Sequence, residues 1–328
     1  MNKIGVVSNT GWTLTFGETL MNGTNCFLSG LAYSVGNIKP IDGLAGVENV
    51  SIELLNTLKS RGLKNFCEDS RTIPEMCLAS AQQTLQAANL TPAQIHAVVF
   101  TSSNSDGLVA DDDETALFAA LHGAGFVKTR IIGLTLQACS ACGEALQIAC
   151  DLINDPAKKA LVIVFGKKKA NRLGPQANTI FSDGAASCIV SADSGEFEIC
   201  AIESMINTYL GSMGRAGNIA QTHGGLLDLR ELSRKVCAKS GVQAKSMRAF
   251  FGTNASLGHL NFMAQAAGMP LDKVYQDDVA EYGHLHSCDN LISLKNYSTK
   301  QTLNPNDHLM LTAWSSHVVS AAVLRYIG

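Results

Sequence analysis

Short apolar runs recur along the chain and predict β-strands that are buried on both faces. They cover residues 96–103, 130–138, 160–166, 185–191 and 308–314. A helical pattern occupies residues 74–90 and stops before Thr91-Pro92, and a second one begins after Cys139. Alternating strands and helices favour an α/β protein with largely parallel central sheets.

The same order of elements is predicted twice. In the first half a strand runs to Cys139 and is followed by a helix and two strands; in the second, a predicted strand at 274–283 runs to His284 and is followed in the same way. Cys139 precedes its next strand by 21 residues, and His284 precedes its own by 24. We therefore expect two duplicated halves, 1–195 and 196–328, whose strand-to-helix corners meet near one axis.

Three cysteines lie within the fifteen residues LQACSACGEALQIAC. Cys142 belongs to the apolar stripe of the predicted helix and Cys150 lies beside that stripe, so both are expected to be core residues. Cys139 differs because it stands where the strand stops and the helix has not begun. Unpaired amides and the helix dipole favour a thiolate there, and the same amides suit an oxyanion. A catalytic nucleophile is one interpretation of Cys139.

Two other interpretations of this segment stay open from the residues alone. Cys139 and Cys142 have the spacing of a dithiol redox pair. They could also form half of a zinc site that His284, His286 or Cys288 completes.

Composition narrows the class of protein. Of 328 residues, 46% are hydrophobic and 16% charged, and the formal net charge of −3 gives no electrostatic case for nucleic acid. No apolar run is long enough to span a membrane and no signal peptide is evident, so we expect a cytoplasmic protein with mostly reduced cysteines. One short basic run, Lys167, Lys168 and Lys169, stands out.

Several motifs resemble the thiolase-fold condensing enzymes, most closely the β-ketoacyl-ACP synthase III group. LQACSACGEAL resembles the nucleophile turn, FSDGAAS at 181–187 the FGDGA motif, and LTAWSSHVVSAAV at 311–323 the glycine-rich oxyanion loop. The resemblance implies a five-layered αβαβα thiolase-like fold made of two pseudo-duplicated halves. It also implies acylation of Cys139 by an acyl thioester on the phosphopantetheine of acyl carrier protein or coenzyme A, with no permanently bound cofactor and no metal.

The chain departs from that group at two positions. Thr253 occupies the position of the catalytic histidine, and His284 occupies that of the asparagine. A histidine with an aspartate five residues later, here Asp289, resembles a Cys-His-Asp acyltransferase offshoot of the family. This resemblance implies that His284 removes a proton from an alcohol or amine acceptor and that Asp289 orients the ring.

The resemblance predicts an acyltransferase of specialised, fatty acid or polyketide metabolism acting on a small-molecule acceptor. The backbone near Ser316 is expected to donate to the oxyanion, with His317 in the pocket, and Lys167 to Lys169 to receive coenzyme A phosphates or an acidic carrier protein. A homodimer is expected, or a heterodimer with a homologue. One alternative is a decarboxylative condensing 3-oxoacyl synthase in which His284 and His317 replace the missing pair. Another is a non-catalytic partner subunit, which Thr253 favours and the intact Cys139 opposes.

Overall fold

The computed structural model describes residues 25–45, 50–102, 111–153, 155–167, 179–212, 219–315 and 317–328. A first group of elements contains β1 (Phe27–Val35), α2 (Ile73–Ala87), β4 (Ala97–Ser102), α3 (Asp111–Gly123), β5 (Arg130–Leu134), α4 (Ala141–Leu152), β6 (Lys159–Gly166) and β7 (Gly184–Ser191). A small two-stranded antiparallel sheet, β2 (Asn37–Pro40) with β3 (Asn65–Glu68), and the helix α1 (Ile52–Ser60) that connects its strands are inserted between β1 and α2.

The second group begins after β7. It contains β8 (Phe197–Ile206), α5 (Thr208–Ser212), α6 (Ile219–Ser240), β9 (Ala249–Phe251), α7 (Leu257–Ala267), α8 (Asp277–Tyr282), α9 (Asp289–Lys300), β10 (His308–Trp314) and β11 (Val318–Tyr326). The predicted strands at 96–103, 160–166, 185–191 and 308–314 and the predicted helix at 74–90 correspond to β4, β6, β7, β10 and α2.

The two groups repeat one strand order. The sheet runs β5-β4-β6-β7-β1-β8-β11-β10-β9, and β1 meets β8 through two residue pairs only. Beyond β9, Val274 forms a parallel bridge with Phe250 and so takes the place that β5 has beside β4. The halves are therefore pseudo-duplicated, as predicted. Among the named strands, β5-β4-β6 and β9-β10 pair parallel, while the strands between them pair antiparallel.

The predicted strand at 274–283 is wrong beyond its first residue. Only the bridge at Val274 is extended, and Asp277–Tyr282 forms helix α8. Two aspartates, Asp277 and Asp278, occupy the first turn of α8, where acidic side chains complement the positive end of the helix dipole. His284 still follows this segment directly, so its place before α9 is unchanged.

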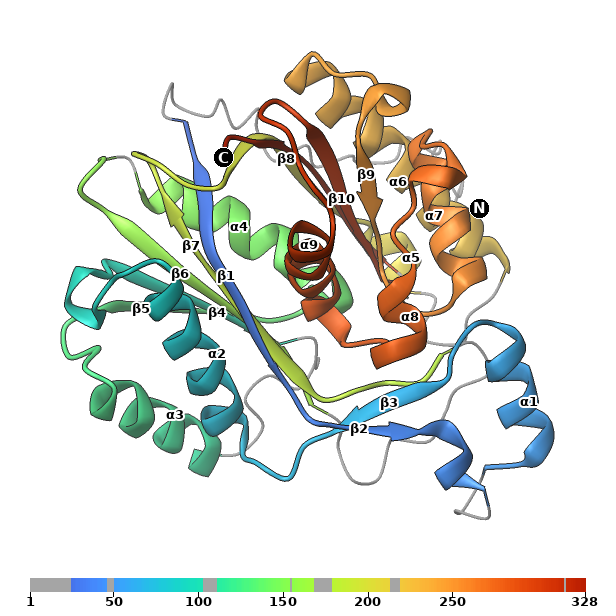
Figure 1. The fold of residues 1–328 in the computed structure, drawn as a ribbon, viewed down its shortest axis with the longest axis horizontal. Coiled ribbons are helices and arrows are strands. Elements are labelled where there is room, and N and C mark those ends of the chain that lie inside the picture. The colour runs from blue at the N-terminus through green and yellow to red at the C-terminus, as the bar shows by residue number, and fades with distance from the viewer. Residues whose placement is uncertain are drawn as a thin grey trace, which may run out of the picture.

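Five layers are visible in Figure 1. Helices α4 and α9 lie in the middle, between the two groups of strands, while α2 with α3 and α6 with α7 cover the two outer faces. Three apolar clusters fill the spaces between these layers. Gly143 lets α4 approach β11 closely, because a Cβ there would lie 2.4 Å from the side chain of Ser320. The expected αβαβα thiolase-like architecture is confirmed.

Within the described part of the chain, every helix is too short or too polar to cross a membrane.

Candidate active site

The turn before Cys139 has an unusual backbone. Strand β5 ends at Leu134, earlier than the predicted 138, because Leu136 (φ 71°) and Ala138 (φ 45°) adopt left-handed conformations. Such conformations cost a non-glycine residue about 1–2 kcal/mol each. The short 3-10 helix η3 (Ala138–Ser140) then leads into α4. This strained turn places Cys139 at the amino end of a central helix, partly exposed.

The neighbouring thiol of Cys142 has a different environment. It is 1% exposed in the core between the two sheets, and burial raises its pKa to about 12. A thiol of this kind stays protonated at neutral pH, so the geometry favours Cys139 alone as the nucleophile of the segment.

His284 is held by backbone hydrogen bonds to the start of the FSDGAAS segment and to Ile180, the residue before it. Its N–H donates to the carbonyl of Ile180 at 3.0 Å, and its carbonyl accepts from the N–H of Ser182 at 2.9 Å. The ring is 2% exposed. Pairing with residues 180–182, which precede β7, brings a second-half histidine to the first-half nucleophile.

Cys139, His284 and Asp289 form a continuous relay. His284 Nε2 lies 3.2 Å from Cys139 Sγ, and His284 Nδ1 lies 2.6 Å from Asp289 Oδ2. Two backbone amides hold the carboxylate: Leu285 N–H donates to Oδ1 at 2.8 Å and Asn254 N–H to Oδ2 at 2.7 Å. The three residues that were predicted from the sequence are thus in contact, in the order that a nucleophile, a base and an orienting acid require.

The site favours the charged form of His284. Burial disfavours an imidazolium, but the charges of Asp289 and Cys139 and the hydrogen bonds to both outweigh it, and they raise the pKa from the ordinary 6.5 to about 10. At neutral pH the ring is therefore positively charged and lies between two acidic groups.

The raised pKa of His284 predicts a pH-dependent contribution to stability. Because the folded protein binds this proton more tightly than the unfolded chain, the contribution is full below pH 6.5 and is lost as the pH rises to about 10. We expect the difference in unfolding free energy between wild type and His284→Gln to shrink over that interval. Urea denaturation of both proteins at several pH values measures it; a difference that stays constant or grows would contradict the assignment.

His286 is a second buried histidine beside the relay. Its φ is 59°, and its ring stacks on Phe181 at 4.7 Å and 16°. The ligand atoms of Cys139, His284 and His286 all lie within 4.8 Å of one another, so these three residues could also hold a metal ion. Cys142 and Cys288, the other two predicted zinc ligands, are not in this set.

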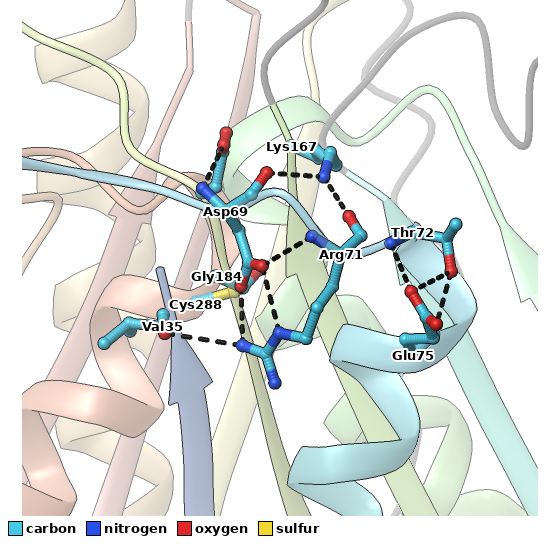
Figure 2. A network of polar contacts seen from close by, with 9 residues as sticks. Val35, Asp69, Arg71, Thr72, Glu75, Lys167, Gly184 and Cys288 are labelled. Carbon is cyan, nitrogen blue, oxygen red and sulfur yellow. Dashed lines mark hydrogen bonds and ion pairs between the residues drawn. The ribbon is translucent and has the colours of Figure 1, made fainter. Parts of the chain in front are cut away.

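The thiol of Cys288 is used elsewhere. Its Sγ lies 3.4 Å from the carbonyl oxygen of Val164 and 3.5 Å from that of Gly184. Figure 2 shows Cys288 beside Gly184. It is a core residue that ties η6 (His286–Cys288) to β6 and β7.

Gly166 provides the space that His286 occupies. A Cβ at Gly166 would lie 2.3 Å from His286 Cδ2 and 2.5 Å from Cγ. We expect Gly166→Ala to destabilise the protein by about 1–3 kcal/mol, the usual range for overpacking. Because His286 Cβ itself lies 2.6 Å from that position, most of the cost should disappear in a His286→Gly background, which removes both the ring and the Cβ. Chemical denaturation of the two single variants and the double variant tests this, and equal costs in both backgrounds would show that the His286 side chain is not the obstacle.

Thr253 has a structural contact. It is 3% exposed, and its Oγ1 accepts a hydrogen bond from the backbone N–H of Trp314 at 3.1 Å. The next residue, Asn254, holds Asp289 through its amide, a contact that the sequence analysis did not identify. A backbone donor leaves no signal in residue type; its proximity to Thr253 was the available clue.

His259, which the sequence did not single out as a site residue, lies near the relay. Its ring stacks on that of Trp314 at 4.8 Å and 7°. Burial and the positive charge of His284 lower its pKa to about 4, so the ring is neutral at physiological pH.

The predicted oxyanion loop connects β10 and β11 next to the nucleophile turn. Ser140 Oγ donates to the carbonyl of Val318 at 2.9 Å, which ties the turn to this loop. The ring of His317 packs on Gly211, since a Cβ at Gly211 would lie 3.5 Å from the ring. The carbonyl of His317 accepts a hydrogen bond from the N–H of Asn207. Ser316 lies outside the described residues, so its role as an oxyanion donor stays a prediction.

Lys167 joins the end of β6 to the chain after β3. Its ammonium donates to the carbonyl of Asp69 at 2.9 Å and to that of Arg71, and dashed lines mark both bonds in Figure 2. The guanidinium of Arg71 in turn binds the Asp69 carboxylate. Lys168 and Lys169 lie outside the described residues. A phosphate or carrier-protein contact of this basic run remains a prediction.

A polar cavity of about 620 Å³ lies in the second half, away from the relay. Residues of segments 246–248 and 272–277, with Tyr297, Gln301 and Asp307, line it. Cys139, His284 and Asp289 are not among its lining residues, so it does not define the space for a substrate at the relay.

Comparisons with known proteins agree with this architecture. Residues 237–326 match the family model "3-Oxoacyl-[acyl-carrier-protein (ACP)] synthase III C terminal". The acyltransferase ChlB3 superposes with a TM-score of 0.78 at 18% identity, over 92% of this chain and 98% of that one. The chain has a 3-oxoacyl-ACP synthase III fold.

Two synthase structures extend this likeness. The 3-oxoacyl-ACP synthase III of Aquifex aeolicus gives a TM-score of 0.74 at 19% identity, covering 92% of this chain and all (100%) of that one. The enzyme of Pseudomonas aeruginosa gives 0.75 at 18%, covering 93% and 99%. No curated protein sequence matches the chain significantly. At these identities the synthase III fold is established, while the reaction is a separate question.

Proposed function

We propose that this protein is an acyltransferase that carries an acyl group on Cys139 and delivers it to a hydroxyl or amine acceptor. The observation that carries the proposal is the relay from Cys139 Sγ through His284 to Asp289, with contacts of 3.2 and 2.6 Å. A histidine between a thiol and a carboxylate can donate a proton in one half-reaction and accept one in the other.

In the first half-reaction the thiolate of Cys139 attacks the carbonyl of an acyl thioester. The bond between the acyl carbon and the carrier sulfur breaks, and the imidazolium of His284 gives its proton to the departing thiolate. The backbone amides at the start of α4 form the positive end of its helix dipole, and they stabilise the developing oxyanion.

Acylation changes the electrostatics of His284. The negative charge of Cys139 is one of the causes that raise the pKa of His284 to about 10. Acylation turns the sulfur into a neutral thioester and removes that charge. The pKa of the ring then falls toward the range of a useful base. In the second half-reaction neutral His284 takes the proton of the acceptor, the acceptor oxygen or nitrogen bonds to the acyl carbon, and Cys139 leaves as a thiolate.

Decarboxylative condensation is the second candidate, and the match of residues 237–326 to a synthase III model favours it. That reaction needs donors that stabilise the carbanion left when a malonyl group loses carbon dioxide. Thr253 stands where the family has its histidine, and its Oγ1 already accepts from Trp314. This contact favours acyl transfer over condensation.

Product analysis separates the candidates. The protein is incubated with acyl thioesters of acyl carrier protein or coenzyme A, first with alcohol or amine acceptors and then with a malonyl thioester. An ester or amide without carbon dioxide release supports acyl transfer, whereas release from the malonyl donor supports condensation. An inert protein that activates a homologous synthase on mixing would instead establish the partner-subunit role.

We further propose a homodimer formed through β5. Among the described residues this strand pairs with β4 alone, and Leu136, two residues past its end, is a large apolar side chain that is 67% exposed. An edge strand beside an exposed apolar side chain suits pairing with a second copy. Sedimentation equilibrium of wild type and Leu136→Asp tests this: a monomeric wild type would contradict it.

A further inference from the structure

A second buried carboxylate lies near the relay, on α8. Asp278 is 1% exposed and receives three hydrogen bonds: from Ser293 Oγ at 2.9 Å, Tyr275 OH at 3.1 Å and Asn296 Nδ2 at 3.0 Å. Burial raises the pKa of this carboxyl, and the three donors oppose that shift. Burying a carboxylate costs folding free energy unless donors satisfy it. A buried hydrogen-bond network that is satisfied in this way makes its surroundings rigid.

One of these bonds continues to the relay. Ser293 gives its proton to Asp278, so its oxygen is free to accept from Asn254 Nδ2, at 3.1 Å. The backbone N–H of the same Asn254 donates to Asp289 Oδ2 at 2.7 Å. Hydrogen bonds therefore run without interruption from Asp278 through Ser293 and Asn254 to Asp289, and all four residues are at most 2% exposed.

We propose that Asp278 is a positioning residue, which acts through Ser293 and Asn254 to aim the Asp289 carboxylate at His284.

The direction of the bonds supports this role. A carboxylate accepts only, so Asp278 compels Ser293 to donate to it and to accept from Asn254. The Asn254 side chain is thereby anchored, which fixes the orientation of its own backbone amide. Asp289 Oδ2 receives both that amide and the His284 ring, so a shift of the amide would move the oxygen that the ring contacts. A displacement of a catalytic group by about 1 Å can lower the reaction rate by about 100-fold.

Other contacts hold Asp278 from the side away from the relay. Asn296, which donates to Oδ1, accepts from Tyr33 OH at 2.8 Å, and Tyr33 OH lies 3.4 Å from Tyr282 OH. Strand β1 of the first half is thus joined to α8 and α9 of the second. The chain to Asp289 is anchored across the interface of the two halves.

The test breaks the hydrogen-bond chain at two residues and leaves Cys139, His284 and Asp289 unsubstituted. Ser293→Ala and Asn254→Ala each break the bond between the two side chains, and Asn254→Ala keeps the backbone amide. We expect each to slow the transfer step by about 10- to 100-fold, in the range of supporting residues that orient a site. Because both interrupt one chain, the double variant should be no slower than the slower single variant.

Ser80→Ala is the matched control. Ser80 is also fully buried, and its Oγ pairs with that of Ser187 at 2.7 Å, far from the relay in the outer layer of the first half. This variant loses the same kind of buried hydroxyl bond and should transfer at the wild-type rate. Multiplicative effects of Ser293→Ala and Asn254→Ala, or an equal loss in Ser80→Ala, would overturn the proposal.

The rate measurements rest on the proposed function, because they need acyl transfer to occur. A spectroscopic measurement that needs no catalysis tests the positioning role separately. The proton in the 2.6 Å bond between His284 and Asp289 should give a far-downfield proton resonance in the folded wild-type protein. We expect Ser293→Ala and Asn254→Ala to shift or broaden it, and Ser80→Ala to leave it in place. A resonance unchanged in both chain variants would refute the positioning role even if no acyl transfer is found.

Discussion

Cys139→Ala should show no covalent acyl adduct by intact mass spectrometry after incubation with acyl thioesters, whereas the wild-type protein gains the mass of one acyl group. The reason is that Cys139 supplies the sulfur in contact with His284 at 3.2 Å, and alanine has no atom that can bond to the acyl carbon. Transfer to any acceptor should be lost with the adduct.

Cys142→Ala is the matched control for this experiment. Cys142 lies three residues away on the same segment, but it is buried and its pKa is raised to about 12. Its loss should leave the adduct unchanged. An adduct that persists in Cys139→Ala, or that disappears in Cys142→Ala, would show that the nucleophile is misassigned.

Asp289→Asn should slow deacylation of a preformed acyl-enzyme by about three to four orders of magnitude, the loss known for a triad acid changed to its amide. The carboxylate accepts from His284 Nδ1 at 2.6 Å and thereby leaves Nε2 to face the sulfur. An amide in that place can present its NH₂ to the ring, which favours the other tautomer and removes the charge that stabilises the imidazolium.

The measurement is a single-turnover experiment in which acyl-Cys139 is formed first and an acceptor is then added. The variant also loses an acceptor for the Asn254 or Leu285 amide, so its fold must be verified by circular dichroism and thermal melting. A well-folded Asp289→Asn that deacylates within tenfold of wild type would show that Asp289 only holds the backbone.

Much of the fold follows from local patterns. Strands at β4, β6, β7 and β10 have continuous apolar runs, and α2 has a capping box at Thr72 and Glu75, so these elements are readable from short windows of residues. Hydrophobic patterns predict an element poorly where one or two residues set the backbone conformation. The segment at 274–283 reads as a strand, yet acidic residues at its centre begin α8, and β5 stops early at two left-handed residues.

Part of the candidate site was also predictable. The place of Cys139 between a strand and a helix depends on local sequence, and the motif resemblance implied His284 and Asp289. Asn254 and Ser293 could not be found in this way, because a backbone amide and a buried serine have no distinctive sequence pattern. Their roles depend on distances between segments that are 35 to 39 residues apart.

From the residues alone came the strands β4, β6, β7 and β10, the helix α2 and the places of Cys139 and His284 just before α4 and α9, because hydrophobic period and local chain chemistry fix these features. The contact between Cys139 and His284, which are 145 residues apart, follows from the packing of the two halves. Packing also decided how the Asp289 carboxylate is held, by the backbone amides of Asn254 and Leu285. Contact and burial depend on how separate elements pack, and packing sets the charge on His284 that the proposed chemistry uses.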